Sequence, residues 1–109
     1  MTVTIHAETP PLRQDSAGAL RIGDSRVLLE LVIRAFQDGA TPEAIVQRYP
    51  ATSLSDVYSV IGYYLRHSDE IGRYLVERER LAAEVRQRIE NRQGDLSELR
   101  QRLLARSGA

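Results

Sequence analysis

Apolar and polar residues alternate at the start of the chain. Over Thr2–His6 the apolar residues Val3 and Ile5 lie between polar neighbours, which is the period of a half-buried strand. The short apolar segments Leu12–Gln14 and Ala19–Ile22 are separated by Asp-Ser-Ala-Gly, a turn composition in which glycine supplies a positive φ. The pattern therefore predicts an N-terminal strand followed by a small β-hairpin.

Further along, the period becomes helical. Apolar residues predict a first helix over about Leu28–Asp38, ended by Gly39 in the left-handed conformation. A second, short helix begins at the N-cap Thr41 and stops before Pro50. A third opens at Ser53 with an aspartate three residues later, as in a capping box, and continues to about residue 67. These three helices are expected to form one compact body.

The first helix is apolar on more than one face. Such a helix is usually buried on most sides, so a second layer or a second chain is expected to cover it, and we predict a homodimer. The third helix has a narrower apolar stripe that we expect to face inward. The residues of that stripe are Leu54, Val57, Tyr58, Ile61, Tyr64 and Leu65.

A long amphipathic segment follows Ser68. Its seam residues are spaced alternately four and three apart, as in a coiled coil, although arginine occupies two of the positions. Glycine followed by aspartate at 94–95 predicts a break between a segment ending at Gln93 and a last helix over Leu96–Ala105. We therefore expect a body over residues 1–78 and an arginine-rich tail over 79–109. The seam consists of Ile71, Leu75, Arg78, Ala82, Val85, Ile89, Arg92, Leu96, Leu99 and Leu103.

Composition narrows the class of protein. A chain of 109 residues and 12.3 kDa has the size of one small domain, and 42% hydrophobic residues make it too apolar for a disordered chain. Without cysteine there is no disulfide or thiolate zinc site. All 15 basic residues are arginine and are balanced by 15 acidic ones, which disfavours a strongly basic nucleic-acid binder. No signal-peptide or membrane-span pattern occurs, so we expect a cytoplasmic protein without a membrane partner.

Candidate chemistry is sparse. The two histidines, His6 and His67, have no ligand-spaced partner, and the acidic residues are scattered over helical surfaces. Gly18 and Gly23 flank a hairpin strand and lack the strand-to-helix context of a phosphate-binding loop. We therefore predict no catalytic residue, no metal site and no cofactor, and a protein that is not an enzyme.

The second and third helices have the spacing of a helix-turn-helix unit, with the third as the recognition helix. Its predicted outward face carries serines, a tyrosine and one basic residue, where base recognition usually employs Arg, Lys, Asn or Gln. A DNA-binding transcriptional autoregulator is thus an alternative function, with weak DNA binding. The candidate DNA-contacting residues are Ser55, Ser59, Tyr63 and Arg66.

Three stretches, Gly18–Val27, Phe36–Pro50 and Asp56–Leu65, together resemble the bacterial family catalogued as domain of unknown function 433. The resemblance covers about Pro11–Leu75. Members of that family resemble antitoxins, so the resemblance implies a toxin–antitoxin pair whose toxin is a PIN-like ribonuclease encoded next door. The positions that match the family's motif are Ser25, Arg26, Gly39, Tyr49, Pro50 and Asp56.

The tail over residues 79–106 combines an apolar stripe with guanidinium groups. A ribonuclease of the implied kind resembles a carboxylate-lined magnesium site, and an inserted arginine could pair with those acids in place of the metal. A self-associating coiled coil and a solvated helix with ion pairs one turn apart are the alternatives. The candidate toxin-binding residues are Arg86, Arg88, Ile89, Arg92, Leu96 and Leu99.

Overall fold

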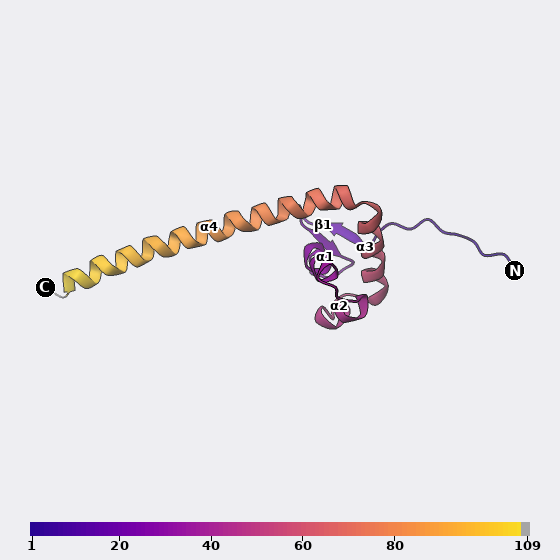
Figure 1. The fold of residues 1–109 in the computed structure, drawn as a ribbon, viewed down its shortest axis with the longest axis horizontal. Helices are drawn as coiled ribbons and strands as arrows, with labels where there is room; N and C mark the ends of the chain where they lie inside the picture. The colour runs from indigo at the N-terminus through magenta and orange to yellow at the C-terminus, as the bar shows by residue number, and fades with distance from the viewer. Residues whose placement is uncertain (108–109) are drawn as a thin grey trace. The chain divides into compact units, whose positions relative to one another are not determined.

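The structure, a computed structural model, describes residues 1–107 (Figure 1). The chain forms two compact units, residues 1–73 and 74–109, whereas the sequence placed the boundary after residue 78. The elements are β1 (Leu12–Gln14), β2 (Leu20–Ile22), α1 (Leu29–Gln37), α2 (Pro42–Arg48), α3 (Leu54–Arg66) and α4 (Ser68–Ser107).

The predicted hairpin is confirmed. Strands β1 and β2 are antiparallel, with Leu12 opposite Ile22 and Gln14 opposite Leu20. Gly18 takes a φ of 87° in the connecting turn, a conformation that glycine adopts without a Cβ clash. The hairpin therefore forms where the turn composition and the flanking apolar residues predicted it.

The predicted strand over Thr2–His6 is wrong. Within residues 1–107 the sheet has two strands, and residues 1–9 are exposed and have no regular secondary structure. An alternating pattern gives a strand only when a neighbouring strand satisfies its backbone N–H and C=O groups, and no described strand pairs with residues 2–6. Val3 and Ile5 are consequently left in solvent.

The helices of the body begin or end at residues that cap them. The hydroxyl of Thr41 accepts a hydrogen bond from the Ala44 N–H (3.2 Å), and the hydroxyl of Ser53 accepts one from the Asp56 N–H (3.2 Å). Gly39 follows α1 with a φ of 98°. These local signals confirm the three predicted helices to within one or two residues.

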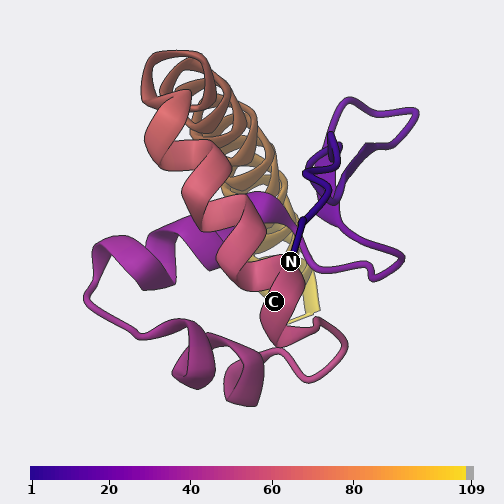
Figure 2. The same ribbon diagram turned by 90° about the vertical axis from the view of Figure 1, so that its right-hand side faces the viewer.

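The core of the first unit is centred on α1, which contacts α2, α3 and β2 (Figure 2). Leu29, Val32, Ile33 and Ala35 are buried, and the other apolar side chains of α1 are half-buried. A single chain thus covers most of α1, so the width of its apolar surface no longer requires a second chain. The buried apolar residues are Ala19, Ile22, Leu29, Val32, Ile33, Ala35, Ile45, Val57, Val60, Ile61 and Ile71.

Half of the inward stripe predicted for α3 is wrong. Val57 and Ile61 are buried as expected, but Leu54, Tyr58 and Leu65 are exposed at 42%, 51% and 59%. Val60, which the pattern did not select, is fully buried. The inward face is rotated because α3 packs against α1, α2 and β2 together, and the hydroxyl of Tyr58 reaches solvent, where it donates to the carboxylate of Glu43 (2.6 Å).

Helix α4 is continuous, so the break predicted at residues 94–95 is wrong. One helical glycine costs about 1 kcal/mol relative to alanine, and the good helix formers on both sides of Gly94 outweigh it. Every described side chain from residue 83 to 106 is exposed. No helix within residues 1–107 is long and apolar enough to cross a membrane.

Candidate interaction sites

An exposed apolar stripe runs along α4. Val85, Ile89, Leu96, Leu99 and Leu103 follow the seam spacing and are each about half exposed, at 49% to 59%. A stripe of this kind on a surface helix normally packs against another surface. Nothing within the described residues covers it.

One turn of this stripe forms a shallow depression of about 150 Å³ lined by Val85, Arg88, Ile89 and Arg92. Three of the six candidate toxin-binding residues therefore lie together, with Val85 as a neighbour that the prediction left out. Leu96 and Leu99 continue the same apolar face toward the C-terminus.

Arginines border the stripe on both sides. In the heptad defined by the seam they occupy the flanking e and g positions, while most acidic residues lie at the outer b and c positions. Asp95 is an acid among the flanking positions. The bordering arginines are Arg86, Arg88, Arg100 and Arg102, and the outer acids are Glu84, Glu90 and Glu98.

Some arginines of α4 are held by its own carboxylates. Arg80 pairs with Glu77 and Glu84, each at 2.6 Å, and Arg86 pairs with Glu79 at 2.9 Å. The hydrogen bond from Arg80 lowers the pKa of Glu77, and both acids raise the pKa of Arg80. In the described part of α4, no ion pair involves Arg88, Arg92, Arg100 or Arg102. Among the candidate toxin-binding arginines, Arg86 is therefore held by a carboxylate of its own helix. Arg88 and Arg92 can form ion pairs with a partner.

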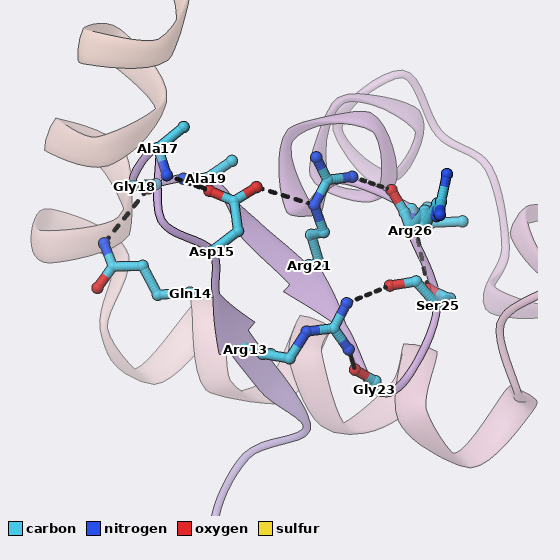
Figure 3. A network of polar contacts seen from close by, with 11 residues as sticks. Arg13, Gln14, Asp15, Ala17, Gly18, Ala19, Arg21, Gly23, Ser25 and Arg26 are labelled. Atoms are coloured by element: carbon cyan, nitrogen blue, oxygen red, sulfur yellow. Dashed lines mark hydrogen bonds and ion pairs between the residues drawn. The ribbon is translucent and has the colours of Figure 1, made fainter.

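A second site surrounds the loop after β2 (Figure 3). The guanidinium of Arg13 donates to the carbonyl oxygens of Gly23 (2.6 Å) and Ser25 (3.0 Å). Arg21 pairs with Asp15 at 3.0 Å and also donates to the carbonyl oxygen of Arg26. Two arginines on neighbouring strands therefore fasten residues 23–26 to the hairpin.

The same loop lies against the start of α3. A Cβ at Gly23, where φ is 54°, would approach the Oδ2 of Asp56 to 2.7 Å. Asp56 gives its backbone N–H to Ser53, yet its carboxylate lies beside Gly23, so the predicted capping box is confirmed for the serine only. The sequence pattern gave no signal for this contact, because the two residues are far apart in the chain.

The other family-motif positions, except Arg26, also support the fold. Gly39 ends α1, and the carbonyl oxygen of Tyr49 accepts from both the N–H and the hydroxyl of Thr52, which shapes the turn at Pro50. The hydroxyl of Ser25 donates to the Ile22 carbonyl oxygen (2.6 Å). Arg26 is exposed, and within residues 1–107 its guanidinium has no hydrogen bond or ion pair.

Asp15 gives the hairpin a dependence on pH. Its carboxylate accepts from the N–H groups of Ala19 and Ala17, both at 2.9 Å, and from Arg21. The Ala19 N–H, with smaller effects from Arg21 and Ala17, holds the pKa of Asp15 below its ordinary value. The stabilisation is therefore present above the ordinary pKa of an aspartate and is lost as the pH falls through the lowered one.

We expect Asp15→Asn to reduce the free energy of unfolding at pH 7 and to have less effect near pH 2. Urea titrations at both pH values measure the difference. Asp24→Asn, at an exposed carboxylate of the next turn, is the matched control and should change little. Equal losses at both pH values would contradict the role assigned to the ionised carboxylate.

A third site is a cleft of about 310 Å³ beside α3. The structure places three of the four candidate DNA-contacting residues in its lining, namely Ser59, Tyr63 and Arg66, whereas Ser55 is exposed outside it. The remaining lining residues were not selected from the sequence, because nothing local indicates that the N-terminal segment passes α3. They are Glu8, Thr9, Pro10, Pro11 and His67.

These features define a mainly helical protein with a small N-terminal hairpin, a helix-turn-helix-like body and a long C-terminal amphipathic helix. Residues 16–64 match the model of the family described as "Protein of unknown function (DUF433)", which confirms the resemblance for this part of the chain. No curated protein and no solved structure matches the chain. The matched residues include all six motif positions and end before α4 begins.

Proposed function

We propose that the protein is a non-enzymatic interaction protein, the cytoplasmic antitoxin of a toxin–antitoxin pair, which binds and neutralises a PIN-like ribonuclease through α4. The observation that carries the proposal is the exposed stripe of α4 with its bordering arginines, of which Arg88, Arg100 and Arg102 have no ion pair within the described residues. An amphipathic helix with this pattern suits a groove on a partner, with anchors three and four residues apart.

The charges of α4 indicate the chemistry of that groove. Arg88 and Arg92 lie in and beside the apolar depression, so a surface that covers it must also satisfy two guanidinium groups. Carboxylates do this best, because the guanidinium fork binds them with two parallel hydrogen bonds. A ribonuclease site built from carboxylates around magnesium would supply such partners, and an arginine bound there would take the place of the metal.

Pairing of α4 with a second copy is less well supported. In a parallel pair Arg92 would face its own copy inside the seam, where an unpaired charge is costly. Self-association of α4 is accordingly a proposal of secondary rank, and it would occur only while no toxin is bound. The homodimer predicted from the apolar first helix stays a prediction.

Regulation of transcription through α3 is the alternative function. The helix-turn-helix-like arrangement of α2 and α3 favours it. Against it, Arg66 is the one basic residue of the candidate contact face, and Asp56 lies near the start of the helix, where phosphates are usually met.

Truncation separates the two functions. We expect a chain ending at Arg78 to stay folded in its first unit but to lose all growth rescue when it is co-expressed with the ribonuclease encoded beside it. DNA binding through α3 would survive the truncation and weaken steeply with salt. Full rescue by the truncated chain would contradict the proposal.

A further inference from the structure

The cleft beside α3 has the dimensions and walls of a small-molecule site. Its volume of about 310 Å³ is at the lower end of the range for ligand pockets, which begins near 300 Å³. All of its lining residues belong to the first unit, and they come from the N-terminal segment and from one face of α3.

One wall is formed by two proline rings that the backbone holds in place. The carbonyl oxygen of Pro10 accepts from the Leu12 N–H (2.7 Å), and that of Pro11 accepts from the Gly23 N–H (2.8 Å). Proline also has a fixed φ, so this wall loses little conformational freedom when a ligand binds.

The other wall is aromatic. The rings of Tyr63 and His67 are stacked with their centroids 4.2 Å apart and an interplanar angle of 21°. The Nδ1 of His67 is 3.1 Å from the carbonyl oxygen of Tyr63, and because a carbonyl only accepts, Nδ1 carries the hydrogen. In the neutral ring Nε2 is then an acceptor. A cleft lined by stacked rings and by prolines is suited to a flat, planar group.

Three polar side chains of the cleft, Ser59, Tyr63 and Arg66, have no polar partner within residues 1–107. Arg66 is exposed and has no ion pair within residues 1–107, and Ser59 and Tyr63 have no side-chain hydrogen bond there. The guanidinium lies against Gly62, where a Cβ would be 3.3 Å from its Nη1, so the glycine leaves room for it on the helix. An anionic group beside this guanidinium would gain a charge-assisted hydrogen bond.

We propose that this cleft binds a nucleotide, with the base against the Tyr63–His67 stack and the prolines and the phosphate on Arg66 and Ser59. Stacking on aromatic rings together with an arginine at the phosphate is the general chemistry of unpaired nucleotides. Glu8, at the N-terminal side of the cleft, repels phosphate but accepts from N–H donors. It therefore favours guanine, which presents two adjacent donors, over uracil.

The full chain is titrated with guanosine 5′-monophosphate while its backbone amide NMR signals are followed. We expect shifts at residues 59–67 and 8–12, with a dissociation constant of about 1 mM or lower. Guanosine alone and inorganic phosphate alone should each bind at least about tenfold more weakly, because each lacks one of the two contacts. Uridine 5′-monophosphate should bind more weakly than the guanosine nucleotide.

Substitutions in the cleft test which side chains contact the nucleotide. Arg66→Gln should weaken nucleotide binding about tenfold, whereas Arg48→Gln, which removes an exposed arginine outside the cleft, should not. Tyr63→Leu should weaken binding by a similar factor, and Tyr63→Phe, which keeps the stacked ring, should retain most of it. Thermal melts of each variant confirm that the fold is intact.

Any of three results would overturn the proposal. They are no amide shifts up to about 10 mM nucleotide, phosphate binding as tightly as the nucleotide, or equal losses of nucleotide affinity for Arg66→Gln and Arg48→Gln.

A short single-stranded RNA distinguishes the source of the ligand. Tighter binding of the RNA assigns the site to a nucleotide within a strand, and equal or weaker binding assigns it to a free nucleotide. The outcome is independent of toxin neutralisation, because α4 is unchanged in every variant.

Discussion

Replacing Arg92 with leucine and Arg88 with alanine in the full chain is expected to abolish growth rescue against the co-expressed ribonuclease. Both side chains line the depression on the stripe of α4 and have no ion pair within the described residues. A hydrogen bond to a charged group contributes about 1.5–3 kcal/mol, so loss of both arginines should weaken binding by about a hundredfold or more. Rescue at several levels of toxin induction measures the loss.

Arg80→Leu is the matched control for this experiment. It removes an arginine from the outer side of the same helix, where Arg80 is held by Glu77 and Glu84. Such exposed pairs contribute only a few tenths of a kcal/mol to a helix, so rescue should persist. If the double variant rescues growth as well as this control does, the inhibitory role of the two arginines is wrong.

The single substitution Arg92→Leu should also strengthen self-association. It makes the seam apolar from Val85 to Leu103, and leucine is the residue that such seams prefer. Sedimentation equilibrium of the purified chain should show a larger dimeric fraction than the unsubstituted chain at the same concentration. An unchanged fraction would show that the seam is not a surface for a second copy.

Ile33→Ala is expected to have the largest effect on stability. Ile33 is fully buried in α1, and truncation of such a residue to alanine costs about 2–5 kcal/mol, because the cavity left behind relaxes only partly. Small domains are stable by about 5–15 kcal/mol in total, so this substitution should remove a large part of the free energy of unfolding of the first unit.

Tyrosine fluorescence during urea unfolding is the appropriate measurement, since the chain has no tryptophan and the helical signal of α4 would dominate circular dichroism. Leu54→Ala is the control, because Leu54 is 42% exposed although the sequence pattern placed it in the core. This substitution should reduce the free energy of unfolding by about 0.5 kcal/mol or less, as surface substitutions usually do. Equal losses of unfolding free energy for the two variants would contradict the burial of Ile33 in α1 and the exposure of Leu54 in α3.

Local signals predicted the elements of the body well. The caps at Thr41 and Ser53, the glycine after α1 and the hairpin turn at Gly18 each act within about four residues, so the sequence alone contains the whole interaction. The heptad spacing of α4 is equally local. Its continuity through Gly94 differs from the prediction, because the helical neighbours on both sides outweigh the cost of one glycine.

Among the candidate site residues, the sequence selected Arg88, Ile89 and Arg92 correctly as neighbours, because residues three and four apart share one face of any helix. It also selected Ser59, Tyr63 and Arg66, which lie on one face of α3 for the same reason. The opposite wall of that cleft could not be predicted, since it depends on where a distant segment runs.

What the sequence by itself determined was therefore the set of helices, the hairpin and the apolar stripe with its bordering arginines. The tertiary structure decided the rotation of α3, which buries Val60 and exposes Tyr58, and the approach of Asp56 to Gly23. It also decided that residues 2–6 form no strand. The physical reason is common to all three. Caps and periods follow from neighbours along the chain, whereas burial and strand pairing depend on surfaces brought together from distant segments, to which no local pattern refers.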